Sequence, residues 1–213
     1  MMRFFCIFAK TIAMIEVKDA TIAIGGKVLA KGLSFIANDG KLTCITGSEG
    51  CGKTTLIRTL MGFLPVKEGF VSVDGELLTV YSSHAFRQMM AYMPQEMRLL
   101  AHQLKAPEWP ECEASEYGVW NEQMPKVTPE QQPEPLSPEA IYTLMEKTLQ
   151  EQVEKQIIIA DEPAACMSSE MTLKVLQLLR KQTEMGKTVL IASRNSQLVG
   201  YADQVIELKW IQN

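Results

Sequence analysis

The sequence predicts an α/β fold in which helices flank a mostly parallel β-sheet, with an N-terminal antiparallel β subdomain and a reduced helical subdomain. Three observations predict this class. Apolar and polar residues alternate from Met14 onwards at the period of a strand. A glycine-rich loop joins a strand signal to a helix signal at residues 47–54. In the second half, short apolar runs alternate with helical patterns, as is typical of parallel strands covered on both faces.

Strands dominate the expected structure up to residue 46. The first signals are four apolar residues that alternate with polar or small ones: Ile15, Val17, Ile22 and Ile24. Gly25-Gly26 supplies a turn, and strand signals continue through residues 33–35 and 42–46. A helix follows Lys53, with Gly62 marking its end. The run Phe70–Val73 then predicts another strand.

The C-terminal half begins with a helix signal at Ser137. This residue offers a capping hydroxyl, Pro138 fits a position that needs no amide donor, and Glu139 places an acid in the first turn. The helix carries one apolar stripe: Ile141, Leu144, Met145, Leu149 and Val153. Buried strands are predicted at 157–160 and 188–192, with a helix at 169–183 between them.

Two segments do not fit a packed core. Residues 105–139 hold seven of the ten prolines and eight glutamates against two lysines, so we interpret them as an irregular insertion. Residues 1–13 contain the apolar run Phe4–Ala9, which is far shorter than the ~18 residues that cross a bilayer. This run is also short for a secretory signal, so we interpret residues 1–13 as an N-terminal extension.

Charge and cysteine content exclude several classes of protein. The net charge is −4, so there is no broad basic surface for nucleic-acid binding. The five cysteines are scattered and none forms a CxxC pair, which argues against a disulfide framework or a zinc site. A reducing cytoplasm fits this cysteine pattern best.

The strongest motif is a full match to GxxxxGK[ST] between a strand and a helix. Its residues, with the threonine that follows, are the candidate phosphate-binding set: Gly47, Ser48, Glu49, Gly50, Cys51, Gly52, Lys53, Thr54 and Thr55. Glycines allow backbone amides to converge on phosphates at a positive helix N-terminus. Lys53 adds a cation for the β and γ phosphates, and Thr54 offers a hydroxyl to Mg²⁺.

A second motif places two carboxylates directly after a buried strand. Asp161 and Glu162 follow the apolar run 157–160, at the strand end where open α/β sheets bind ligands. Asp161 is placed to hold Mg²⁺, directly or through water. Glu162 is placed to orient or deprotonate an attacking water.

The order of these motifs resembles the nucleotide-binding subunit of ATP-binding cassette (ABC) transporters over residues 14–208. The resemblance also rests on Met93-Pro94-Gln95 and on the last core strand signal at 186–193. It implies a P-loop NTPase core, with Gln95 sensing Mg²⁺ and the attacking water. Thr54, Gln95 and Asp161 are then the expected metal site, and Glu162 and Gln95 the catalytic residues.

The departures from the family pattern bear on activity. Ile24 stands where the family stacks an aromatic residue on adenine, and the signature Leu-Ser-Gly-Gly-Gln is replaced by residues 136–140, Leu-Ser-Pro-Glu-Ala. In the head-to-tail dimer of this family, the helix start at the signature points its amides at the γ-phosphate held by the other subunit. Pro138 removes one amide donor, and Glu139 brings a negative charge towards that phosphate, so this chain is not expected to complete the ATP site of a second subunit. Arg194 replaces the histidine that contacts the γ-phosphate, and we expect it to bind phosphate. Ser168 replaces an aspartate that communicates across the dimer.

The predicted organisation is an extension at 1–13 and one ATP-binding domain at 14–213, with a divergent helical subdomain at 97–156 that contains the insertion. The resemblance implies an ATP-binding, weakly ATP-hydrolysing subunit of an ABC-type membrane transport complex, with ATP and Mg²⁺ as cofactors. The expected partners are a multi-span permease and a second ABC-type subunit, as heterodimer or homodimer. The chain is expected in the cytoplasm, peripheral at the inner face of the membrane through that permease. The alternative is a catalytically silent, ATP-responsive interaction module.

Overall fold

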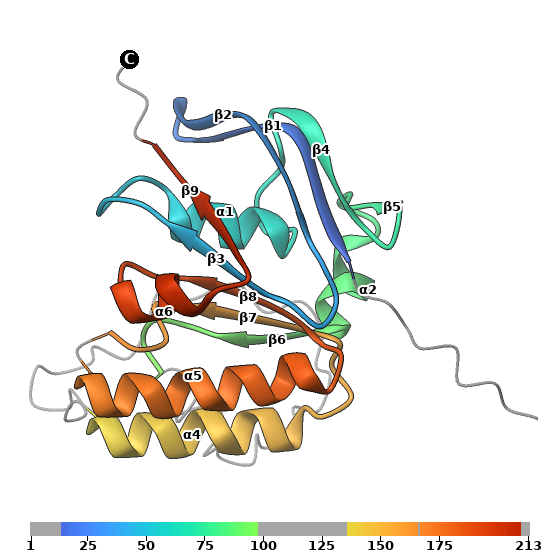
Figure 1. The fold of residues 1–213 in the computed structure, drawn as a ribbon. Coiled ribbons are helices and arrows are strands. Elements are labelled where there is room, and N and C mark those ends of the chain that lie inside the picture. The colour runs from blue at the N-terminus through green and yellow to red at the C-terminus, as the bar shows by residue number, and fades with distance from the viewer. Residues whose placement is uncertain (1–13, 98–135, 166, 210–213) are drawn as a thin grey trace, which may run out of the picture.

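The computed structural model describes residues 14–97, 136–165 and 167–209 (Figure 1). The predicted extension and the insertion up to residue 135 lie outside the described residues. The strands are β1 Ile15–Ile24, β2 Lys27–Ala37, β3 Leu42–Thr46, β4 Glu68–Val73, β5 Glu76–Leu77, β6 Met90–Met93, β7 Ile157–Asp161, β8 Thr188–Ala192 and β9 Gln204–Glu207. The helices are α1 Lys53–Leu60, α2 Ser83–Gln88, α4 Pro138–Glu151, α5 Ser169–Glu184 and α6 Ser196–Tyr201.

The N-terminal strands form an antiparallel sheet in the order β2-β1-β4-β5. Gly25 and Gly26 both have positive φ and close the hairpin between β1 and β2, in which Ile15 pairs with Ala37. Asp74 and Gly75, also at positive φ, connect β4 to β5. The predicted antiparallel β subdomain is therefore confirmed.

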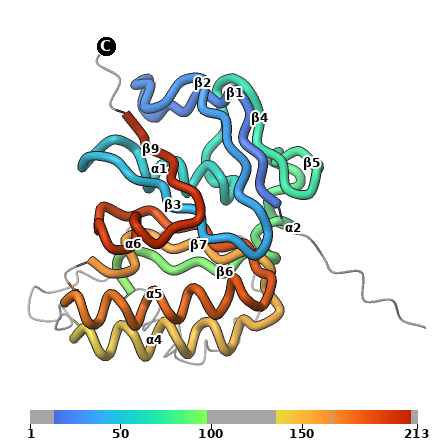
Figure 2. Tube along the Cα trace, viewed as in Figure 1, coloured from blue at the N-terminus to red at the C-terminus, as the bar shows by residue number. Residues whose placement is uncertain are grey.

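The second sheet has the order β6-β7-β8-β3-β9, and every neighbouring pair is parallel. Figure 2 shows how the trace brings β9, from the end of the described chain, beside β3. Because all five strands run the same way, their carboxyl ends lie along one edge. The loops after β3, β6, β7 and β8 therefore meet there.

The two faces of this sheet are covered differently. Helix α1 packs between the antiparallel and the parallel sheets, whereas α4 and α5 lie on the opposite face (Figure 1). Alternate residues of β7 accordingly enter two cores: Ile157 and Ile159 face the α1 side, and Ile158 and Ala160 face the α5 side. Burial on both faces explains why β7 reads as an uninterrupted apolar run.

The structure confirms the helix start at Ser137 but shortens the predicted apolar stripe. Helix α4 ends at Glu151, and Val153 is 56% exposed beyond it. Val153, the last residue of the predicted stripe, therefore has helical spacing in the sequence but lies outside the helix. No helix within the described ranges is both long and apolar enough to cross a membrane.

Candidate functional site

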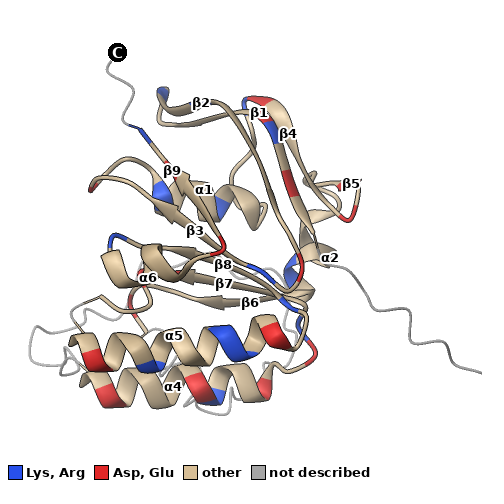
Figure 3. Ribbon diagram, in the orientation of Figure 1, with Lys and Arg blue, Asp and Glu red and all other residues tan. Residues whose placement is uncertain are grey.

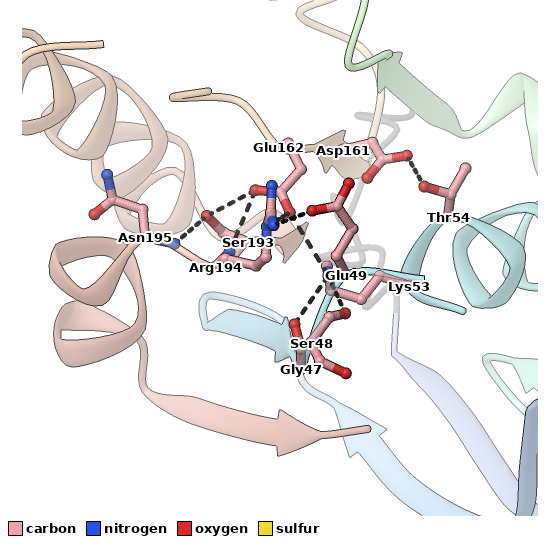
Figure 4. A network of polar contacts seen from close by, with 10 residues as sticks. All are labelled: Gly47, Ser48, Glu49, Lys53, Thr54, Asp161, Glu162, Ser193, Arg194 and Asn195. Atoms are coloured by element: carbon pink, nitrogen blue, oxygen red, sulfur yellow. Dashed lines mark hydrogen bonds and ion pairs between the residues drawn. The ribbon is translucent and has the colours of Figure 1, made fainter. Parts of the chain in front are cut away.

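The candidate site lies at the carboxyl edge of the parallel sheet. The glycine loop connects β3 to α1, Gln95 follows β6, Asp161 ends β7, and Arg194 follows β8. Register brings the ends of these strands together, since Ile45 and Asp161 both pair with Ala192 of β8. Residues far apart in sequence are therefore neighbours in the site, as Figure 4 shows.

The loop conformation requires glycine at both of its ends. Gly47 has φ 149°, and a Cβ there would lie 2.5 Å from the carbonyl oxygen of Leu208. Gly52 has φ 103°, and its Cβ would lie 3.1 Å from the Cβ of Leu29. Neither position tolerates a side chain without a shift of its neighbours. The motif glycines therefore keep the backbone close to the surrounding strands.

The backbone amides at the N-terminus of helix α1 have no partner within the helix. Within the described residues no side chain caps its N-terminus, where Gly52 adopts a left-handed conformation. The first amides of a helix and its dipole attract anions. Lys53 is 7% exposed, and its Nζ donates to the carbonyls of Gly47 and Ser48 at 3.0 and 3.1 Å. This helix end, with the lysine beside it, has the chemistry to attract an anion such as phosphate.

Asp161 has a buried carboxylate with one oxygen engaged and one left over. Thr54 Oγ1 donates to its Oδ2 at 2.7 Å, whereas Oδ1 has no hydrogen-bond partner among the described residues. Burial raises the pKa of Asp161 above its ordinary value, and the hydrogen bond from Thr54, which lowers that pKa, offsets only part of the effect. A buried acceptor without a donor is costly unless something binds it. Together with the Thr54 hydroxyl, Asp161 offers the hard oxygen ligands that Mg²⁺ prefers.

Glu162 is held in a strained backbone conformation. Its φ is 48°, and its amide donates to the carbonyl of Ala192 at 2.8 Å. A non-glycine residue in this region is uncommon and concentrates at functional sites. The carboxylate accepts from Ser193 Oγ at 3.4 Å and from the Arg194 amide at 3.2 Å. It also lies 3.7 Å from Lys53 Nζ.

Arg194 bridges two carboxylates (Figure 4). One guanidinium nitrogen lies 2.9 Å from Oε2 of Glu49 in the glycine loop, and Nε lies 3.5 Å from Oε1 of Glu162. The next residue, Asn195, donates its amide to Ser193 Oγ and caps α6. Arg194 is thus carried on a short segment that is tied to both β8 and α6.

These groups surround a cleft of about 320 Å³. Its lining includes most of the predicted site: Glu49, Gly50, Gly52, Lys53, Thr54, Thr55, Gln95, Asp161, Glu162 and Arg194. The other predicted residues sit behind it: Gly47 and Ser48 present carbonyls to Lys53, and Cys51 is 1% exposed in the core. Ile24 also lines the cleft, at the position expected to face the base.

Two residues at this cleft were not anticipated from the sequence. Leu29 lines it beside Ile24, and Ser193 donates to Glu162. The sequence signal for Leu29 is the Gly25-Gly26 hairpin, because a tight turn returns the chain past Ile24. Ser193 directly follows β8, at the carboxyl edge where side chains reach ligands.

Among the described residues, the N-terminus of α4 is capped by a side chain, unlike that of α1 in the cleft. Ser137 accepts a hydrogen bond from the Ala140 amide at 3.2 Å, Pro138 occupies the first turn, and Glu139 follows. Ser168 caps α5 in the same way, through the Met171 amide at 3.2 Å. Both serines therefore act as helix caps of their own chain.

Solved structures share this fold. A nucleotide-free ATP-binding cassette from an ABC transporter superposes with TM-score 0.66 and 19% identity, covering 92% of this chain and 87% of that one. The Clostridium perfringens protein cbiO1, part of the ABC transporter complex cbiONQ, gives TM-score 0.68 and 19% identity, covering 92% and 84%. The mixed α/β core is therefore that of an ABC cassette, a P-loop NTPase fold.

Curated relatives match this chain over different lengths. The Listeria innocua manganese transport system ATP-binding protein MntB is 26% identical, covering 91% of this chain and 85% of that protein. The hemin import ATP-binding protein HmuV of Chelativorans is 36% identical over 86 residues, 40% of this chain. The matched part of this chain covers about a third or less of the length of HmuV and of several other curated relatives. The ABC transporter family model matches residues 30–165, most of the described core and both motif regions, and the chain accordingly belongs to the ABC transporter family.

Proposed function

We propose that this chain is the ATP-binding subunit of an ABC-type membrane transport complex and that its cleft holds Mg-ATP. One observation carries the proposal: the uncapped start of α1 and Lys53 face the carboxylates of Asp161 and Glu162 across one cleft. Anion-binding groups opposite a metal-binding carboxylate match a metal-bound triphosphate. Relatives named for manganese transport and for hemin import support a transport role, and because those two cargoes differ we propose no cargo for this chain.

Each cleft residue has a defined part in this proposal. The amides of the glycine loop and Lys53 bind the phosphates, and Thr54, Asp161 and Gln95 hold Mg²⁺, whose charge offsets that of the phosphates when it is bound. Glu162 orients the attacking water and takes its proton on a carboxylate oxygen. Ser193 donates to one oxygen of that carboxylate, and Lys53 and the Arg194 guanidinium lie within 3.7 Å of the other.

Turnover by the chain alone is proposed to be low. The start of α4, which corresponds to the family signature, is already capped by Ser137 and carries Glu139 in its first turn. A second cassette with an intact signature would supply the missing donors, so we favour a heterodimer over an active homodimer. The complex would sit at the cytoplasmic face of a membrane through a separate permease. Glu162 in the cleft favours slow hydrolysis over a silent regulatory module.

Calorimetry and turnover assays test these points separately. Wild-type protein should give Mg²⁺-dependent heat with ATP; no such heat with ATP or GTP at millimolar concentration would reject nucleotide binding. The triple variant Pro138→Gly, Glu139→Gly and Ala140→Gln restores the signature and should raise ATPase activity. Addition of Glu162→Gln to that variant should abolish the gain. Unchanged activity in the restored variant would refute the α4 start as the limiting element.

A further inference from the structure

Arg194 and Glu49 form an ion pair across the mouth of the cleft, and no part of the proposed reaction uses it. The Glu49 side chain is 85% exposed and belongs to the phosphate-binding loop, while Arg194 comes from the segment after β8. The pair therefore joins the two walls between which a nucleotide would enter.

The charges that line the cleft disfavour the entry of phosphate, and Glu49 of the ion pair contributes to them. Three carboxylates, Glu49, Asp161 and Glu162, face two cations, Lys53 and Arg194. The formal charge of the lining is thus one negative, although the predicted ligand is a polyanion. Glu49 is the only one of these carboxylates that is mostly exposed, so it adds negative charge without belonging to the buried pair at the end of β7.

We infer that Glu49 competes with the terminal phosphate of the nucleotide for the Arg194 guanidinium and thereby lowers affinity for ATP. This inference rests on the proposed function. Arg194 keeps its contact with the largely buried Glu162 and exchanges its exposed partner, Glu49, for phosphate. The exchange is favourable because exposed ion pairs are weak, whereas guanidinium–phosphate hydrogen bonds are charge-assisted and suit a planar donor.

The position of Arg194 makes the competition selective for the last phosphate. Its Nε lies 3.5 Å from Oε1 of Glu162, the residue proposed to act on the attacking water, and the same oxygen lies 3.7 Å from Lys53 Nζ. A group beside both residues is next to the bond that would be cleaved. Loss of the Glu49 charge should therefore favour ATP more than ADP.

Titration calorimetry with Mg-ATP and with Mg-ADP tests the inference. Glu49→Gln should tighten ATP binding about two- to five-fold, the range that one exposed ion pair provides, and should change ADP binding less. Glu49→Asp keeps the charge on a shorter side chain and should give an intermediate gain. High salt should shrink the difference because it screens exposed pairs.

Glu151→Gln is the matched control. It removes one negative charge and an exposed ion pair, Lys147–Glu151 at 3.6 Å, from the end of α4, which leads to the opposite edge of the sheet. In an Arg194→Ala background, which should itself bind ATP more weakly, Glu49→Gln should lose its benefit. This cycle isolates the pairwise contact.

The outcomes separate the two proposals. If Glu49→Gln and Glu151→Gln shift ATP affinity equally, or if the gain persists without Arg194, the competition is refuted while nucleotide binding stands. If wild-type protein binds neither nucleotide, the proposed function fails and the competition fails with it. A gain for ATP that exceeds the gain for ADP and depends on Arg194 supports the inference.

Discussion

Helices α1 and α4 begin in opposite ways. The first turn of α1 follows a left-handed glycine, has no side-chain cap among the described residues, and contains one charged side chain, that of Lys53. The first turn of α4 is capped by Ser137 and contains Glu139. Figure 3 marks acidic residues on α4 and basic residues on α1. Both helices carry the same kind of dipole, yet only α1 leaves it available to an anion. The start of α1 is thus open to the proposed nucleotide, whereas the start of α4, which would face a second subunit's nucleotide in the proposed dimer, is already capped.

The largest expected effect is the loss of the cation at α1. Lys53→Ala should weaken Mg-ATP binding about 30- to 1,000-fold, because it removes a buried charge and leaves Glu162 without its closest lysine. Calorimetry measures this change. Lys147→Ala on α4 is the control, since that lysine is exposed, and it should leave affinity unchanged. Equal affinities in the two variants would contradict the assignment of α1 as the phosphate site.

The next effect concerns the Mg²⁺ site proposed between α1 and the end of β7. Asp161→Asn keeps an oxygen that can accept from Thr54 but removes the charge, so the Mg²⁺-dependent part of ATP affinity should fall about 10- to 100-fold. Titrations with Mg²⁺ and with EDTA measure that part. If ATP affinity in the variant responds to Mg²⁺ as in wild type, Asp161 does not serve the metal.

A smaller effect is expected from the glycine that precedes α1. Gly52→Ala should lower the free energy of unfolding by about 1 to 3 kcal/mol, since alanine is strained at φ 103° and its Cβ meets Leu29. Gly25→Ala is the control, because it also has positive φ but nothing lies within 4 Å of its Cβ. Denaturant unfolding should show the larger loss for Gly52→Ala. Identical losses would mean that contact with Leu29 costs nothing.

The smallest effect is expected at α4. Ser137→Ala removes a cap and should lower the free energy of unfolding by about 1 kcal/mol, with no change in ATP affinity of the isolated chain. Ser168→Ala removes the equivalent cap of α5 and should cost a similar amount. Weaker ATP binding in the Ser137 variant would show that the two helix starts are coupled.

The contiguous motifs could be predicted from sequence because their function depends on local order. The glycine loop and the Asp161-Glu162 pair each occupy neighbouring positions, so the loop is predicted from its spacing, and the acidic pair from its place after a buried strand together with that loop. Ile24 shows the limit of such reasoning. It alternates with Ile22 in the sequence, but a register shift after Ile22 leaves Ile22 2% and Ile24 45% exposed.

Pairing between distant strands was beyond the sequence pattern. β6 and β9 gave no strand signal of their own, and their places beside β7 and β3 are set by tertiary contacts. The same holds for the ion pair between Glu49 and Arg194, which depends on β3 and β8 being neighbours. Local spacing therefore identified most of the cleft lining, while the contacts among those residues required the fold.

The hydrogen bond between Thr54 and Asp161 joins residues 107 positions apart. During synthesis, the ribosome must therefore release β7 and then the segment around Arg194 before any complete binding pocket exists. The proposed ATP site is therefore incomplete until the segment around residue 194 has emerged, and ATP bound there would stabilise the folded chain only from that point on.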